Sequence, residues 1–157
     1  VQIIFNMFRH RPREQFFPEA VRRDVGVIVR VPLASGLLTG KFDKDSTFSE
    51  GDHRHFNRKG EAFDKGETFS GVDYAQALEA VEELKDALPD DRSMALNALR
   101  WVLDNPAVGT VIPGASRLEQ LEQNIKASDL PPLNPKVHKS IDTVYARRIK
   151  ESVHQRW

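Results

Sequence analysis

The residues best suited to chemistry lie within residues 108–124, where a short β-branched run turns into an amphipathic helix. Gly114 ends the run, and Ser116 with Glu119 has the spacing of a capping box, in which both side chains satisfy free N–H groups of the first turn. The free N–H groups and the helix dipole favour an anion at such a terminus. Arg117 adds a planar cation suited to a phosphate monoester. This pattern predicts the phosphate end of a βα unit; an ordinary strand–turn–helix corner is the alternative.

A second turn with two glycines follows an earlier β-branched run. Gly36 and Gly40 are one residue too close for a P-loop, and Lys41 is followed by Phe42 instead of serine or threonine. The P-loop interpretation therefore fails. A glycine-containing turn after a strand remains, and its backbone could contact a diphosphate.

Two histidines in the polar middle of the chain, His53 and His55, could suggest a metal site. No carboxylate or third histidine stands at helical spacing to complete a ligand set. We therefore predict a solvated loop here and no metal ligands.

Composition excludes several classes of function. The 157 residues include 23 basic and 23 acidic side chains, so the formal net charge is zero and no overall field favours nucleic acid or an anionic membrane. Cysteine is absent, which excludes disulfides and thiolate chemistry and fits a cytoplasmic protein. No apolar run approaches the roughly 20 residues that span a bilayer. Because the chain enters at Val1 directly on a strand-like run, we expect sequence upstream and interpret the chain as a C-terminal fragment.

The elements that must position these groups alternate between buried strands and helices. Strands are expected at residues 1–8, 25–31 and 108–112, each covered on both faces because its residues are nearly all apolar. A short helix is expected to open at Phe17 and Pro18, with apolar contacts from Ala20 and Val21. Two longer helices follow, one from Tyr74 to Leu88 and one that is capped by Ser93, ends at Asp104 and contains a core Trp101. A fourth helix is expected after Ser116, with a buried stripe of Leu118, Leu121 and Ile125, and the last begins at Asn134-Pro135 with one apolar face made of Val137, Ile141, Val144, Tyr145 and Ile149.

This alternation predicts an α/β fold with parallel strands. Three strands cannot close a barrel, so a small open sheet or part of a larger barrel is implied. The basic stretch from Arg9 to Arg13 is expected to be an exposed loop. Residues 42–73 are polar and aperiodic, and a loop of this length is typical of lids, binding loops or mobile segments.

Four motifs in order resemble the C-terminal half of an aldo-keto reductase. They are the strand around Gln2 to Asn6, VPLASGLLTGK at residues 31–41, ALRWVL at 98–103 and VIPGASR at 111–117. The resemblance covers essentially all 157 residues. It implies the last three β/α units and the C-terminal helix of a (β/α)8 TIM barrel that uses NADPH to reduce aldehydes and ketones.

The resemblance also implies roles at the cofactor. Gln2 stands where a glutamine contacts the nicotinamide carboxamide, and Arg30 where many members stack an aromatic residue on the ring; a guanidinium plane can also stack there. The remaining expected contacts are Leu33, Ser35, Gly36 and Leu38 at the pyrophosphate, Gly114, Ala115, Ser116 and Arg117 at the adenosine 2′-phosphate, and Gln120, Gln123 and Asn124 around adenine and ribose.

The family's catalytic tetrad of Asp, Tyr, Lys and His has no match in this chain, because Tyr74 and Tyr145 lie on expected amphipathic helices. We therefore expect no catalytic residue here and no activity from the chain alone. The parent is expected to be an NADPH-dependent oxidoreductase acting on a small carbonyl substrate. Two alternatives are a non-catalytic nicotinamide-sensing or partner-binding subunit, as in the potassium-channel subunits of this fold, and a stand-alone α/β phosphate-binding domain.

Overall fold

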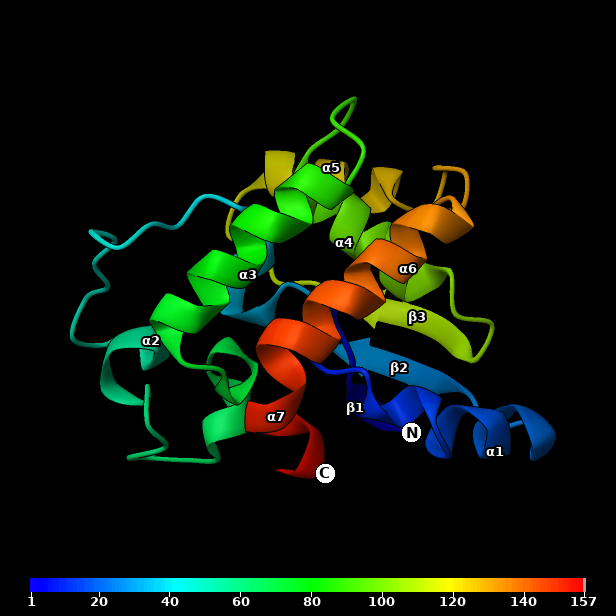
Figure 1. The fold of residues 1–157 in the computed structure, drawn as a ribbon, viewed down its shortest axis with the longest axis horizontal. Helices are drawn as coiled ribbons and strands as arrows, with labels where there is room; N and C mark the ends of the chain where they lie inside the picture. The colour runs from blue at the N-terminus through cyan, green and yellow to red at the C-terminus, as the bar shows by residue number, and fades with distance from the viewer. Residues whose placement is uncertain (157) are drawn as a thin grey trace.

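Three parallel strands form the only sheet among residues 1–156, which are the residues that the computed structural model describes. The strands follow one another across the sheet in chain order, and they are β1 (Gln2–Ile4), β2 (Val27–Arg30) and β3 (Val108–Ile112). Parallel neighbours need long crossovers, and in this chain the crossovers carry helices. The predicted parallel α/β architecture is therefore observed (Figure 1).

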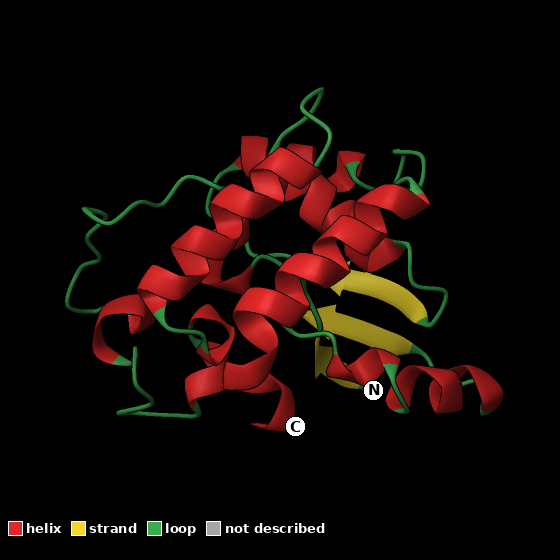
Figure 2. Ribbon diagram, in the orientation of Figure 1, coloured by secondary structure: helices red, strands yellow, loops and turns green. Residues whose placement is uncertain are grey.

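The helices cover one side of the sheet and extend beyond it (Figure 2). The α-helices are α1 (Phe16–Arg22), α2 (His53–Phe56), α3 (Tyr74–Ala87), α4 (Met94–Leu103), α5 (Leu118–Lys126), α6 (Pro135–Val144) and α7 (Lys150–Val153). Short 3-10 turns are η1 (Arg11–Arg13), η2 (Ala34–Thr39), η3 (Lys65–Glu67), η4 (Phe69–Gly71) and η6 (His154–Arg156), and a π-helical turn, η5 (Tyr145–Ile149), joins α6 to α7. No helix of the described residues is both long and apolar enough to cross a bilayer.

Side-chain caps set the starts of the three central helices. Asp73 accepts hydrogen bonds from Ala75 N and Gln76 N, and Ser93 accepts one from Leu96 N at 3.3 Å. Asn134 accepts one from Lys136 N at 2.8 Å, ahead of a proline in the first turn. Each cap satisfies N–H groups that have no partner inside the helix. The predicted start at Ser93 and the predicted start at Asn134-Pro135 are both observed.

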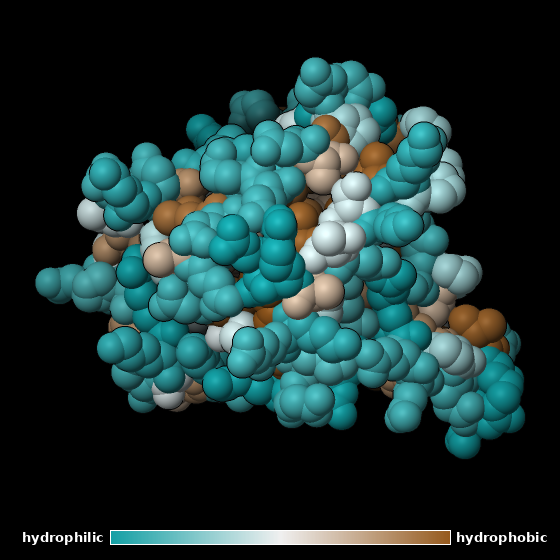
Figure 3. Space-filling model, viewed as in Figure 1, coloured by the Kyte–Doolittle hydropathy of each residue, from teal (hydrophilic) through white to brown (hydrophobic). Residues whose placement is uncertain are grey.

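The core lies between the sheet and α3, α4 and α6. Trp101 is 2% exposed and stacks on Phe5 with ring centroids 4.8 Å apart, so its predicted place in the core is observed. The outer sides of α3 and α6 cross the face seen in Figure 3, where most side chains are hydrophilic and hydrophobic ones form small separate areas. These helices are amphipathic because only one side of each packs on the core.

The opposite face of the sheet is only partly covered within the described residues, where Ile4, the partner of Arg30, is 2% exposed. Val27 and Val29 are buried against the helices, whereas Ile28 and Ile112 are 39% and 48% exposed. The prediction of strands covered on both faces is therefore wrong for β2 and β3, whereas Ile3 and Ile4 of β1 are buried on both faces. A near-continuous apolar run marks a strand of a parallel sheet, but it does not say which elements cover each face.

The stripe predicted for the helix after Ser116 is also uncovered. Leu118, Leu121 and Ile125 are 66%, 47% and 59% exposed on α5, and Val21 on α1 is 56% exposed. Periodicity shows that one side of a helix is apolar, but it does not supply the surface against which that side packs. The prediction that these four side chains are buried is wrong here.

The basic stretch after β1 is not the exposed loop that was predicted, since Arg9, His10 and Pro12 are buried and Arg11 and Arg13 are half-buried. Arg9 is 3% and His10 6% exposed. Arg9 Nε donates to Ser70 O at 2.9 Å, and Arg11 Nη1 donates to His154 O at 3.0 Å. These partners are 61 and 143 residues away along the chain. The stretch therefore ties two distant segments together, and its charges gave no local sign of this.

Candidate functional site

The predicted cofactor residues lie at the carboxyl-terminal edge of the sheet and on its partly covered face. Arg30 ends β2 and pairs in register with both Ile4 of β1 and Ile112 of β3. Gln2 pairs with Ile28 and therefore lies on the same face as Arg30, two residues further from the edge. The loops that follow β2 and β3 consequently begin side by side. Ligands of parallel α/β sheets bind at this edge.

The loop after β2 has an unusual backbone. Val31, Ala34, Ser35 and Gly36 have φ of 53°, 48°, 55° and 98°. Positive φ is rare for residues other than glycine and exceptional for a β-branched residue, and such strain concentrates at functional sites. Among the predicted pyrophosphate contacts, Leu33, Ser35 and Gly36 are half-buried and remain accessible. Leu38 is 0% exposed and lies in the core, so it offers no accessible surface to a ligand.

Arg30 is held by a carboxylate that sequence reasoning missed. The two guanidinium nitrogens of Arg30 pair with the two carboxylate oxygens of Glu67, with 2.7 Å between Nη2 and Oε1. The hydrogen bonds from Glu67 raise the pKa of Arg30 above its usual value. A signal did exist in principle, because an arginine at a half-buried strand end needs an anionic partner. Nothing in the polar residues 42–73 singled out Glu67 as that partner.

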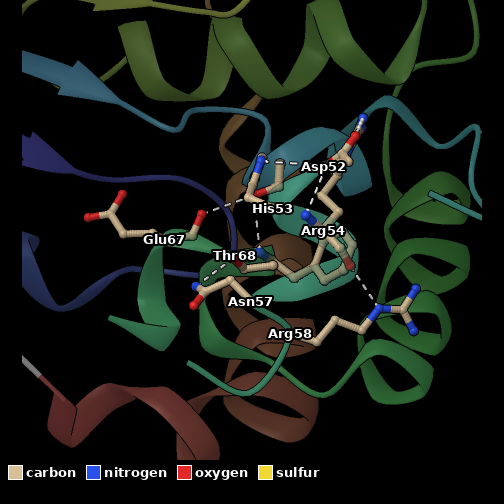
Figure 4. A network of polar contacts seen from close by, with 9 residues as sticks. Asp52, His53, Arg54, Asn57, Arg58, Glu67 and Thr68 are labelled. Atoms are coloured by element: carbon tan, nitrogen blue, oxygen red, sulfur yellow. Dashed lines mark hydrogen bonds and ion pairs between the residues drawn. The ribbon is translucent and has the colours of Figure 1, made fainter. Parts of the chain in front are cut away.

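Glu67 belongs to the long crossover segment (residues 42–73), which is a folded unit rather than a structureless loop (Figure 4). The segment is built around Asn57, which is fully buried: its Nδ2 donates to Thr68 Oγ1 at 3.1 Å, and its Oδ1 accepts from Ala62 N and Phe63 N at 2.9 Å each. In Figure 4 the side chain of Glu67 points away from this network.

A cation further fixes the first half of the crossover segment. Asp52 caps α2 by accepting from Arg54 N, and the Arg54 guanidinium beside Asp52 lowers the pKa of that carboxyl to about 2. The Arg54 guanidinium carbon also lies 4.6 Å from the ring centroid of Phe48, within cation–π range. His53 and His55, the residues considered for a metal, belong to the one turn of α2.

The corner after β3 is the most exposed part of the candidate site. Gly114, Ala115, Ser116, Arg117 and Gln123 are exposed, while Gln120 and Asn124 are half-buried. The predicted capping box of Ser116 with Glu119 is wrong by one residue, since Arg117 is the N-cap of α5. Gln120 Oε1 accepts hydrogen bonds from Ser116 N at 2.8 Å and from Arg117 N at 3.2 Å. Gln120 is therefore occupied in capping, and Arg117 is exposed at the helix start.

One polar atom at this corner has no protein partner. Asn124 Nδ2 is buried without a hydrogen bond, and Asn124 lines a hollow of about 410 Å³ between α4, β3 and α5. A buried donor without a partner costs free energy unless a ligand or water completes it. An amide donor of this kind suits a ring nitrogen or another acceptor of a nucleotide, which fits the position predicted for Asn124.

Comparison with known proteins gives a consistent result. The model of the Aldo/keto reductase family matches residues 1–146. The chain is 32% identical over 153 residues to a probable voltage-gated potassium channel subunit beta of Arabidopsis thaliana, covering 93% of this chain and 43% of that protein. It is 29% identical over 156 residues to the aldo-keto reductase YhdN of Bacillus subtilis, covering 98% of this chain and 44% of that protein.

A solved structure shows the same arrangement of elements. The glycerol dehydrogenase of Gluconobacter oxydans superposes with a TM-score of 0.74 at 28% identity, over 94% of this chain and 42% of that one. The chain thus spans less than half the length of these relatives. The predicted fold class, a portion of a TIM barrel with parallel strands and helices, is confirmed by this match.

Proposed function

Because the chain belongs to the aldo/keto reductase family, we propose that it is the NADPH-binding part of an oxidoreductase that reduces aldehydes or ketones. One observation carries the proposal. Arg30 and Ile112 are paired in register, so the strained loop after β2 and the exposed corner after β3 start from adjacent points on one sheet edge. A dinucleotide needs a contact surface of this kind, with a ring site, a diphosphate loop and a phosphate corner in sequence.

The proposed contacts follow the order of the strands. Gln2 and Arg30 take the nicotinamide end, and Arg117 with the start of α5 takes the 2′-phosphate. The loop between them holds the diphosphate through the accessible residues Leu33, Ser35 and Gly36. Gly114, Ala115 and Ser116 complete the phosphate corner, and Gln120, Gln123 and Asn124 surround adenine and ribose.

NADPH, when bound, supplies a hydride for a carbonyl carbon. The chain's own residues bind and orient the cofactor, and we propose that the proton donor lies outside this chain. Tyr145 is 5% exposed, its Oη is 2.8 Å from His154 Nδ1, and burial raises its pKa, which opposes acid catalysis near neutral pH. The hydroxyl of Tyr74 donates a hydrogen bond to Asp43 O. The purified chain alone is therefore expected to show no reduction of a reactive aldehyde above buffer, and measurable turnover would contradict this part of the proposal.

The test of the 2′-phosphate site is the substitution Arg117→Ala in the full-length protein. The dissociation constants of NADPH and NADH are measured by quenching of protein fluorescence. We expect binding of NADPH to weaken about tenfold, the loss of one charge-assisted contact, and binding of NADH to stay unchanged. Lys126→Ala, at the opposite end of α5, is the matched control and should change neither constant. An equal loss for both cofactors would refute the role of Arg117.

A non-catalytic nicotinamide-sensing subunit is the second candidate function. The similarity to a probable potassium channel subunit beta favours it. The two candidates share the cofactor site and differ in turnover. Full-length protein that binds NADPH and does not oxidise it with any of a panel of reactive aldehydes would support the sensor over the enzyme.

A further inference from the structure

The feature that the proposed contacts leave unexplained is the pairing of Arg30 with Glu67. A two-pronged contact with a carboxylate fixes the plane of a guanidinium as well as its position. Such a contact uses nitrogens at the edge of the guanidinium group and does not involve the two flat faces of the group. The side chains are 30% and 31% exposed, so the pair lies at the boundary between core and solvent.

Glu67 is itself firmly placed by the part of the crossover segment that carries it. Glu67 O accepts from Ser35 Oγ at 3.1 Å, and Ser35 Oγ in turn accepts from Phe69 N at 3.1 Å. Asp64 Oδ1 accepts from Gly66 N at 2.8 Å. A side chain on Gly66 would overlap Arg9 Nη2, so the backbone before Glu67 lies directly on that buried guanidinium.

The next residue, Thr68, is 1% exposed and bonded to the buried Asn57. Ser70 Oγ accepts from Asn6 Nδ2 at 2.9 Å, and the same Asn6 nitrogen donates to Val31 O at 2.8 Å. The backbone on both sides of Glu67 is thus tied to the loops after β1 and β2. This is the support that a precisely placed functional side chain requires.

We propose that Glu67 is a positioning residue that holds the guanidinium plane of Arg30 for stacking on the nicotinamide ring. The inference rests on the proposed function, since it presumes that the ring lies at Arg30. Without Glu67, the long side chain of Arg30 regains its rotamer freedom, and ordering it on each binding event costs affinity.

The negative charge of Glu67 has a second effect that depends on the redox state of the cofactor. The nicotinamide ring of NADP⁺ carries a positive charge and that of NADPH does not. Arg30 by itself would repel the oxidised ring, and the carboxylate offsets that repulsion. Loss of the carboxylate should therefore weaken the binding of NADP⁺ more than that of NADPH. It should leave the binding of 2′,5′-ADP unchanged, because that ligand contains no nicotinamide.

The experiment measures binding of these three ligands by calorimetry to the full-length protein and to Glu67→Gln. We expect about tenfold weaker binding of NADPH, a larger loss for NADP⁺ and a change below about twofold for 2′,5′-ADP. Glu61→Gln is the matched control, because Glu61 is an exposed carboxylate of the same crossover segment and accepts a hydrogen bond from Lys59 N. It should leave all three constants unchanged.

Arg30→Lys provides a second variant that keeps the charge and removes the two-pronged contact. This variant should also weaken the binding of NADPH and leave the binding of 2′,5′-ADP unchanged. Equal losses for all three ligands in Glu67→Gln, with a lowered melting temperature, would show a merely structural role and overturn the proposal. Unchanged binding of NADPH and NADP⁺ would overturn it as well. Wild-type protein that binds none of the three ligands would instead refute the proposed function.

Discussion

Gly36 allows a quantitative test of the strained loop after β2. Its φ of 98° lies where an L side chain is strained, which costs about 1–2 kcal/mol. A Cβ there would lie 2.9 Å from both Cε2 and Cζ of Phe42. The Phe42 ring packs edge-on against Phe48 at 5.2 Å, with Arg54 5.6 Å from its centroid, so it has little room to move. Overpacking of this kind costs about 1–3 kcal/mol.

Gly36→Ala should therefore lower the free energy of unfolding by about 2–5 kcal/mol, the combined range of the two costs. The assay is urea unfolding of the full-length protein, followed by circular dichroism. The affinity for NADPH should fall as well, because the displaced loop is the proposed diphosphate site.

Gly26→Ala is the matched control for this substitution. Gly26 immediately precedes β2, its φ is not in the left-handed region, and a Cβ there meets nothing within 4 Å. The free energy of unfolding of the Gly26→Ala variant should be unchanged or raised by up to about 1 kcal/mol. The reasoning would be refuted if Gly36→Ala were as stable as Gly26→Ala, since neither strain nor contact with Phe42 would then exist.

Two further predictions concern residues away from the proposed cofactor site. The side chain of Asp104 is 6% exposed and accepts hydrogen bonds from Arg100 Nε at 2.8 Å and from Leu133 N at 2.9 Å. Asp104→Ala should lower the free energy of unfolding in urea by about 3–5 kcal/mol, because it leaves the charge of Arg100 without its partner. A loss below about 1 kcal/mol would contradict this. Burial lowers the pKa of His10 below its usual 6.5, so the unfolded chain binds more protons below that pH and stability should fall as pH drops from about 6.5. Melting temperatures between pH 7.5 and 5 should therefore decline less in His10→Gln than in the wild type, and parallel curves would disprove the assignment.

Local signals predicted the helices well. The period from Tyr74 to Leu88, the cap at Ser93 and the Asn134-Pro135 start all correspond to observed helices, because each depends on residues within one or two turns. The parallel strands were also predicted; β3 has the predicted bounds, whereas β1 and β2 are shorter than their apolar runs. Phe5 and Met7, for example, are buried in the core beyond the end of β1.

Contacts between distant segments were not predictable in this way. Arg9 was expected to be exposed because charge usually indicates solvent, yet it is buried against backbone oxygens of segments far along the chain. Glu67 was missed because a carboxylate in a polar segment carries no local sign of its partner. The assignment of Gln2, Arg30 and Arg117 to a cofactor came from family resemblance, and it stays a prediction until binding is measured.

The long crossover segment also has a consequence for how fast the chain folds. Gln2 pairs with Ile28 and Val27 with Val108, separations of 26 and 81 residues along the chain. Closing the longer loop costs about 1 kcal/mol more chain entropy, which corresponds to about a fivefold slower search. We therefore expect β2 to pair with β3 after β1 has paired with β2. Until that step the edge of β2 that faces β3 stays unpaired, and an unpaired strand edge is a site for aggregation.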